Sequence, residues 1–291
     1  DKRDRMTVLL LLGVLLGVNL QDVLRKNLST HYGEQKSVQY TYNLALVLGA
    51  LTVHGFIYGS QWSGHLPSLP YALLYSLGFT GAVYGPMAAM ACGPLSLTVL
   101  LSSFGLVIPT LYGLIALNEQ LNLAGIAGLI LLAVSLVLIN WRRKGEKPFQ
   151  KKWFFFAIAA FLGNGVCSLA QKMHQTRWPG QWCGDFMLEG MGVMVLIALA
   201  FFLVSAGKDR SVSLRGSGYG LPAGFLNAGV NAGMLYLSSR LPATFLYPII
   251  SAGGIVLAWV TARFFFHEKL SSIRQIGFLL GGVAIVLMNL R

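Results

Sequence analysis

Long apolar runs separated by short polar connections dominate the sequence. A membrane-spanning helix needs roughly 20 predominantly apolar residues, and ten segments of suitable length can be drawn along the chain. They are residues 7–26, 39–59, 69–92, 95–117, 121–141, 153–174, 184–206, 217–239, 243–266 and 271–290. The pattern predicts an all-α membrane protein with ten transmembrane helices and no soluble catalytic domain.

The second part of the chain repeats features of the first. Residues of the same type recur in the same order 146 to 149 positions later. The pairs are Gly17/Gly163, Lys26/Lys172, Gly81/Gly229, Gly85/Gly233, Pro94/Pro242, Glu119/Glu268, Leu121/Leu270, Gly128/Gly277 and Asn140/Asn289. Five helices per repeat is an odd number, so the second repeat must be inverted in the membrane, as in many transporters. We predict a first repeat over residues 1–143, a basic linker over 144–152 and a second repeat over 153–291.

Composition and charge agree with this assignment. Only 11% of residues are charged, against about 25% in soluble domains. The net charge of +12 would suggest a nucleic-acid partner in a soluble protein, but here the basic residues lie between apolar segments, so we expect none. The connections after the first, fifth, seventh and ninth segments hold 15 of the 22 Lys and Arg residues. We predict a multi-pass protein of the plasma (inner) membrane, and the positive-inside rule then predicts that both termini lie outside.

Motifs for enzymatic chemistry are missing from the sequence. Cys92, Cys167 and Cys183 have no metal-ligand spacing. The sequence has no Gly-x-Ser-x-Gly elbow, no His-Glu-x-x-His, no phosphate loop and no dinucleotide fingerprint. The first apolar run is followed by no cleavage site and is predicted to be a retained helix. We therefore predict a protein that is not an enzyme and that needs neither a cofactor nor a metal.

A motif near the end of each half carries a family resemblance. A Glu-x-Leu follows the fourth segment of each half and precedes a glycine-rich fifth segment: Glu119 to Leu121 in the first half, Glu268 to Leu270 in the second. Together with the two five-helix halves, this resembles the EamA-type branch of the drug/metabolite transporter superfamily over nearly the full chain. The resemblance implies a central cavity lined mainly by helices 1–4 and 6–9. It does not extend to the first-helix glutamate that small four-helix relatives use for proton-coupled exchange, because helix 1 has none here.

Polar groups within apolar segments are the candidate site residues, because they are costly in a bilayer. In the eighth segment Asn227 and Asn231 share a face with Gly220 and Gly224; they could bind a polar substrate or tie this helix to its neighbours. Other amides and several aromatic side chains lie at similar depth. The predicted substrate-binding residues are Asn19, Tyr42, Asn43, Tyr84, Asn164, Glu189, Asn227, Asn231 and Tyr247.

The acidic residues receive different interpretations. Glu189 has no basic residue three or four positions away, so it could bind a cationic substrate, exchange a proton, or serve as a structural carboxyl group. Asp22 precedes Arg25 and Lys26 by three and four residues, which predicts an intrahelical ion pair at the membrane surface. Glu119 falls at a helix end and is interpreted as structural.

Taken together, the sequence predicts a secondary transporter that moves a small metabolite or drug-like molecule by alternating access through a central cavity between the repeats. A non-transporting membrane receptor or scaffold and a membrane-embedded enzyme remain the alternatives. The expected partners are a small-molecule substrate and the lipid bilayer, with protons as a candidate coupling ion. Monomer and homodimer both remain open.

Overall fold

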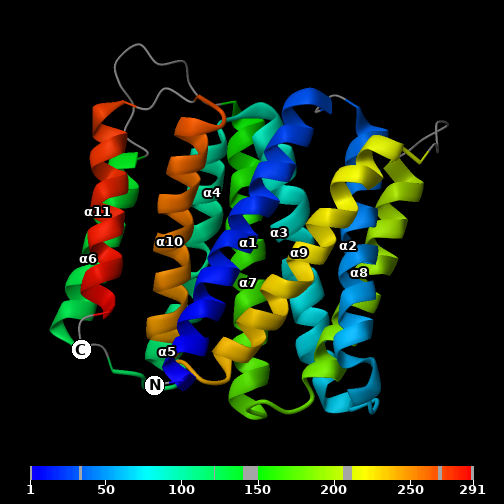
Figure 1. The fold of residues 1–291 in the computed structure, drawn as a ribbon, viewed down its shortest axis with the longest axis horizontal. Helices are drawn as coiled ribbons and strands as arrows, with labels where there is room; N and C mark the ends of the chain where they lie inside the picture. The colour runs from blue at the N-terminus through cyan, green and yellow to red at the C-terminus, as the bar shows by residue number, and fades with distance from the viewer. Residues whose placement is uncertain are drawn as a thin grey trace.

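The computed structural model describes residues 2–32, 35–120, 122–139, 150–205, 212–267 and 271–289, and these residues contain no strand. They form the helices α1 (Lys2–Tyr32), α2 (Lys36–Tyr58), α3 (Leu69–Cys92), α4 (Leu95–Phe104), α5 (Val107–Ala116), α6 (Leu123–Ile139), α7 (Lys151–Arg177), α8 (Cys183–Ser205), α9 (Leu214–Ser238), α10 (Ala243–Phe264) and α11 (Ser272–Asn289) (Figure 1). Two short 3-10 helices, η1 (Gly59–Gln61) and η2 (Leu66–Ser68), connect α2 to α3. The prediction of an all-α chain is confirmed for these residues.

Six helical spans are long and apolar enough to cross a membrane, as expected for a multi-pass membrane protein. They are Arg5–Tyr32, Lys36–Gln61, Leu97–Ala116, Lys151–Arg177, Cys183–Val204 and Ala243–Phe264. Large apolar side chains lie on the outer surface, and Phe56, Leu123 and Val204 are each more than 80% exposed. Such a surface is costly in water and is expected where a protein contacts another apolar phase.

The helix ends follow the predicted segments with two informative differences. The third segment, 69–92, coincides with α3. The first segment was predicted to end at residue 26, whereas α1 continues to Tyr32. The fourth segment is divided into α4 and α5 at Gly105 and Leu106. Pro109 explains this break, because proline has no N–H for the carbonyl four residues earlier, which is that of Gly105.

Small residues set the closest contacts between helices. A Cβ added at Gly81 would lie 2.8 Å from the Ala159 carbonyl oxygen of α7, and one at Gly85 would lie 2.6 Å from the Ala160 nitrogen. Gly220 of α9 makes an equally close contact with α2, because an added Cβ would lie 2.5 Å from the Tyr42 carbonyl oxygen. Glycines of this kind allow membrane helices to pack backbone to backbone.

The helices form a broad, flattened bundle. In Figure 1, α6 and α11 lie together at one edge, and α2 and α8 lie at the opposite edge. Between them, α3 packs along α7 and α1 packs along α9, while α10 contacts both α4 and α5. The helix ends that border the four most basic connections all lie at one end of the bundle, at the top of the view. Four of the six basic residues of the central connection, Arg142, Arg143, Lys144 and Lys147, lie in the range 140–149, which is outside the described residues.

Candidate functional site

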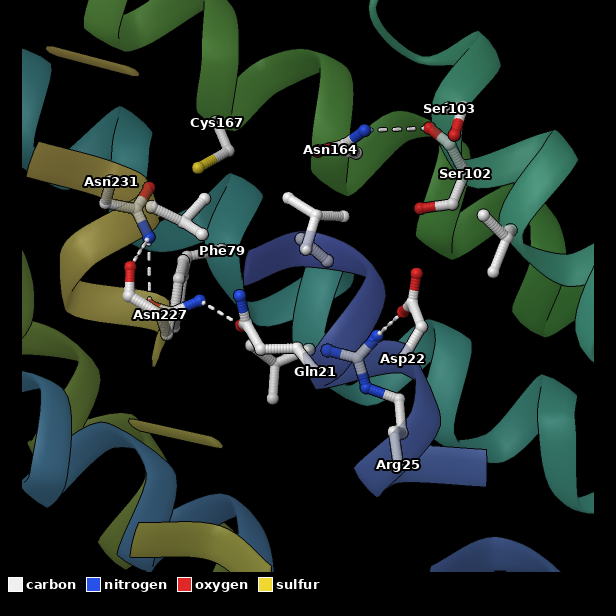
Figure 2. Close-up of a pocket in the computed structure, with 15 residues that line it drawn as sticks. Gln21, Asp22, Arg25, Phe79, Ser102, Ser103, Asn164, Cys167, Asn227 and Asn231 are labelled. Carbon is white, nitrogen blue, oxygen red and sulfur yellow. Dashed lines mark hydrogen bonds and ion pairs between the residues drawn. The ribbon is translucent and has the colours of Figure 1, made fainter. Parts of the chain in front are cut away.

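Two adjoining cavities lie in the middle of the bundle, between helices of the first and second parts of the chain. The larger has a volume of about 130 Å³ and the smaller about 100 Å³. Val18, Ser103, Asn164, Cys167, Val230 and Asn231 line both. The larger is also lined by Gln21, Asp22, Arg25, Phe79, Ala82, Val83, Val99, Ser102 and Asn227, as the close-up in Figure 2 shows.

The cavity lies at mid-height in the bundle. Asn164 is near the centre of α7, Asn227 is near the centre of α9, and Phe79 is near the centre of α3. In a membrane this position would be far from both surfaces, where unpaired polar groups are most costly. The polar lining is therefore either paired within the protein or available to a ligand.

An ion pair forms the charged part of the cavity wall. Arg25 Nη1 donates to Asp22 Oδ1 at 2.8 Å, and both residues are less than 10% exposed. The predicted intrahelical pair is confirmed, and it lies in the cavity wall with α1 continuing for seven residues beyond Arg25. The Arg25 Nε–H has no hydrogen-bond acceptor among the described residues.

A chain of amides forms the neutral part of the wall. Gln171 Nε2 donates to Asn231 Oδ1 at 3.0 Å, and Asn231 Nδ2 donates to Asn227 Oδ1 at 2.9 Å. Asn227 Nδ2 in turn donates to Gln21 Oε1 at 2.9 Å. This chain connects α7 through α9 to α1 and ends one residue before Asp22. Figure 2 shows its part from Asn231 to Gln21. The amides therefore tie α9 to its neighbours, as one of the two interpretations predicts, and they also line the cavity.

The break between α4 and α5 supplies backbone groups beside the cavity. Asn164 Nδ2 donates to the Ser102 carbonyl oxygen at 2.9 Å, and Ser251 Oγ donates to the Ser103 carbonyl oxygen at 2.9 Å. Both carbonyls belong to the last turn of α4, where the ladder changes to bonds three residues apart. Side chains of α7 and α10 thus fasten the broken helix.

Three predicted site residues line the cavities, namely Asn164, Asn227 and Asn231. Tyr42 is fully buried and lies beside Asp22 and Arg25 without being part of either lining.

Two further predicted residues connect helices away from the cavities. Asn19 Oδ1 accepts a hydrogen bond from Thr261 Oγ1 of α10 at 2.9 Å. Tyr247 is fully buried, and its hydroxyl donates to the Ser168 carbonyl oxygen at 3.0 Å. Both residues therefore hold the helices that surround the cavities.

The remaining predicted residues lie among α2, α3 and α8, outside both linings. Asn43 is buried and Tyr84 packs its ring against Phe201 of α8, with 5.0 Å between ring centroids. Glu189 is half-buried, and its Oε2 has no hydrogen-bond partner among the described residues. Gly220 and Gly224, which share a face with the amides in sequence, pack against α2 instead.

Several cavity residues were not predicted as site residues: Gln21, Asp22, Arg25, Phe79, Ser102, Ser103 and Cys167. Two of them, Gln21 and Arg25, follow from one signal in the sequence. Gly17, Gln21 and Arg25 are spaced by four residues, which places them on one helix face. The charges of Arg25 and Lys26 instead suggested that the helix was ending.

Two lysines, one on α1 and one on α7, make matching contacts at the ends of neighbouring helices. Lys26 Nζ donates to the Met90 and Gly93 carbonyl oxygens at the end of α3, at 3.3 and 3.2 Å. Lys172 Nζ donates to the carbonyl oxygens of Ser238 and Leu241 at the end of α9, at 3.3 and 3.0 Å. Cations are favourable at helix C-termini, where carbonyls lack helical partners.

Glu119 completes the second of these arrangements. Its carboxylate accepts from the backbone nitrogens of Ala243 and Thr244 at 2.9 and 2.8 Å, and it lies 3.8 Å from Lys172 Nζ. Glu119 therefore caps the start of α10, in agreement with its structural interpretation. Its counterpart Glu268 lies outside the described residues, as do Leu121, Asn140 and Leu270.

Comparison with known proteins provides information about the fold. No family model and no curated protein matches the sequence. A solved structure described only as "Crystal structure of protein" is similar to this chain with a TM-score of 0.64. The similarity covers 95% of this chain and 96% of that one, at 15% sequence identity. The fold is therefore shared with a protein known from an experimental structure, and nothing about function follows from that likeness.

A second polar cluster lies at the lower end of the bundle in Figure 1, between α7, α8 and the connection that precedes α3. Asp185 accepts from the backbone nitrogens of Ser63 and His65 at 3.0 and 2.8 Å. The Ser68 hydroxyl lies 3.0 Å from His65 Nδ1 and 3.1 Å from His174 Nε2. Ser68 and His174 are completely buried, so this cluster fastens a connection and is not accessible to a substrate.

No group of three or more His, Cys, Asp or Glu side chains suited to a metal ion occurs among the residues that the structure describes. The cavity chemistry therefore consists of one ion pair, one guanidinium N–H without an acceptor, and an amide chain. Such a set can bind a polar molecule by hydrogen bonds and charge.

Proposed function

We propose that this protein is a secondary transporter of the drug/metabolite type, which carries a small molecule across the plasma (inner) membrane by alternating access. The observation that carries the proposal is the polar cavity at mid-height, lined by α1, α3 and α4 on one side and by α7 and α9 on the other. Substrate sites of transporters built from inverted repeats lie at the repeat interface near the centre of the bilayer.

Helix packing supports two inverted five-helix repeats, counted as ten crossings when α4 and α5 form one broken helix. If residues 1–143 correspond to residues 153–291, then α1 corresponds to α7 and α3 to α9. The packing of α3 along α7 is then matched by that of α9 along α1. The lysine contacts follow the same exchange, since Lys26 reaches the end of α3 and Lys172 reaches the end of α9.

Accessibility of Cys167 offers a direct test, because this thiol lines both cavities. In a Cys92→Ser, Cys183→Ser background, a small membrane-impermeant thiol reagent is applied to right-side-out and to inside-out vesicles. Alternating access predicts labelling of Cys167 from both sides. Labelling from one side only would contradict alternating access and would favour a receptor or scaffold.

Matched controls come from the other two cysteines. Cys92 at the end of α3 and Cys183 at the start of α8 lie at opposite ends of the bundle (Figure 1). Each, kept as the single cysteine, should be labelled from one side, and the two sides should differ. The same experiment determines the orientation: the predicted outside location of the termini requires Cys183 to be labelled in right-side-out vesicles.

A further inference from the structure

Two serines at corresponding positions of the two halves contact each other. Ser103 of α4 and Ser251 of α10 are 148 residues apart, which is the offset that relates Pro94 to Pro242. Ser251 Oγ donates to the Ser103 carbonyl oxygen at 2.9 Å. Inverted repeats are related by a pseudo-twofold axis in the membrane plane. If the two halves are such repeats, a residue that contacts its own counterpart lies beside this axis.

The helices that carry the two serines differ in conformation. α4 ends at Phe104, and the Ser103 carbonyl oxygen accepts from the Leu106 nitrogen, three residues later, at 3.1 Å. α10 continues from Ala243 to Phe264, so the Ser251 carbonyl lies within a regular helix, where the donor is the N–H four residues later. The contact therefore joins a broken helix to its unbroken counterpart.

The hydrogen bond runs in one direction only, although both positions carry a hydroxyl. The side chain on the continuous helix donates, and the carbonyl on the broken helix accepts. Ser103 lines both cavities, and Figure 2 shows it in the wall of the larger one. A Cβ added at Gly254 would lie 3.6 Å from Ser103 Oγ. The Ser103 hydroxyl is therefore close to α10, about one turn beyond Ser251.

The sequence of α10 allows a bend at the position where the first-half helix is broken. Gly253 and Gly254 take the positions of Gly105 and Leu106 at the same offset. Glycine is unfavourable within a helix, and sharp kinks occur at glycine and serine pairs. Pro109, which explains the break in the first half, has no proline counterpart in α10 at this offset. The break is therefore built into the first half, whereas α10 can be continuous or bent.

We infer that α10 bends at Gly253–Gly254 in the opposite state of the transport cycle, and that the contact then reverses, with the Ser103 hydroxyl donating to the Ser251 carbonyl. The inference rests on the proposed function, because it concerns how the same cavity changes the side to which it opens. A bend there removes the helical donor of the Ser251 carbonyl, which Ser103 replaces, while the Ser103 carbonyl keeps the Leu106 N–H. The two serines are positioning residues, and each holds one state.

Two substitutions test the reversal, because each removes the hydroxyl that donates in one state. Cys167 is kept as the single cysteine, and its initial labelling rates by a membrane-impermeant thiol reagent are compared between right-side-out and inside-out vesicles. Ser251→Ala should change the ratio of the two rates about two- to tenfold, the factor that corresponds to one hydrogen bond. Ser103→Ala should change the ratio by a similar factor in the opposite direction.

Gly254→Ala is a third variant, and Ser239→Ala is the matched control. Alanine disfavours a bend at residue 254, and its Cβ would be at an ordinary contact distance from Ser103 Oγ. Gly254→Ala should therefore change the ratio in the same direction as Ser103→Ala. Ser239 Oγ donates to the Tyr236 carbonyl oxygen within its own turn, at 2.7 Å. Removal of this hydroxyl should leave the ratio unchanged.

The outcomes separate the inference from the proposed function. Changes in the same direction for the two serine variants, or no change in one or both, would overturn the reversal and leave transport standing if the parent is labelled from both sides. A parent labelled from one side only would overturn the proposed function itself. Thermal unfolding in detergent checks folding, and a purely structural role predicts lower stability without opposite changes in the ratio. Should Gly254→Ala not fold, the two serine variants still decide.

Discussion

The two halves of the chain share one framework and differ in the cavity wall they build on it. Lys26 and Lys172 occur 146 residues apart and make the same pair of contacts at the end of a neighbouring helix. At the same offset, Arg25 corresponds to Gln171 and Asp22 to Ser168. One half therefore contributes an ion pair where the other contributes neutral side chains.

A second set of corresponding positions also differs between the halves, and here the second half carries the polar side chains. At the offset of 148 residues that relates the two proline turns, Phe79 and Val83 of α3 correspond to Asn227 and Asn231 of α9. All four line the larger cavity. The second half is polar where the first is apolar. Residues that repeat hold the helices together, and residues that differ give the cavity its chemistry.

Breaking the Asp22–Arg25 ion pair should have the largest effect on the free energy of unfolding. Arg25→Leu leaves Asp22 buried and unpaired, and the free energy of unfolding should fall by about 3–5 kcal/mol. Gln171→Leu at the corresponding position removes only a neutral donor and should cost about 1–3 kcal/mol. Thermal and denaturant unfolding in detergent measure both. Asp22→Asn added to Arg25→Leu should recover part of the loss, and equal costs at the two positions would contradict the asymmetry.

The lysine contacts should be equivalent in the two halves. Lys26→Met and Lys172→Met each remove charged hydrogen bonds to two carbonyls at a helix end, so each should lower the free energy of unfolding by about 1.5–3 kcal/mol. Lys36→Met is the control, because this lysine is exposed at the start of α2. A loss confined to one of the two lysines would show that the framework is not repeated.

Gly81 and Gly229 correspond in the two halves, but they should respond differently to substitution by alanine. A Cβ at Gly81 would meet backbone atoms of α7, whereas a Cβ at Gly229 has nothing within 4 Å. Gly81→Ala should therefore cost about 1–3 kcal/mol, while Gly229→Ala should be neutral or gain up to about 1 kcal/mol from helix propensity. Unfolding midpoints measured side by side provide the test. Tolerance of alanine at Gly81 would mean that α3 and α7 are less tightly packed than described.

Substitution of the two acids should affect transport differently: a change at Asp22 should alter uptake, and a change at Glu189 should have almost no effect. Glu189 lies outside both cavity linings, so Glu189→Gln should leave uptake and its dependence on an imposed pH gradient nearly unchanged. Asp22→Asn alters a residue of the cavity wall and should change the uptake. Uptake into proteoliposomes with and without the gradient distinguishes the two. Loss of gradient-driven uptake in Glu189→Gln alone would identify it as a coupling group.

The sequence predicted the helices well, because the length of an apolar run is a strong signal. It predicted less about which side chains face inward. A helix such as α8 is apolar on all sides, so its periodicity does not distinguish the inner face from the outer one, and Glu189 could be placed by depth but not by direction. The asparagines of α9 could be found because polar groups are rare in such a helix.

The end of α1 was misplaced for a related reason. Charged residues near the end of an apolar run usually mark a membrane surface, and Arg25 and Lys26 were interpreted in that way. In the structure their charges are satisfied internally, by Asp22 and by carbonyls at the end of α3. Internal pairing of this kind depends on helices distant in sequence, and no local pattern contains it.

The break between α4 and α5 couples displacement of the neighbouring helices to hydration of the polar groups at the break. Its carbonyls at Ser102 and Ser103 are bonded by Asn164 of α7 and Ser251 of α10. Each carbonyl also accepts a backbone bond, from the N–H of Gly105 or Leu106. Motion of α7 away from α10 therefore leaves the carbonyls a donor, and it is Asn164 Nδ2 or Ser251 Oγ that must exchange its bond for one to solvent, because a buried polar group without a partner is costly. Hydration and helix displacement then become a single step. The rate of that step should depend on water activity, so that osmolytes excluded from the cavity slow the cycle without binding to the protein.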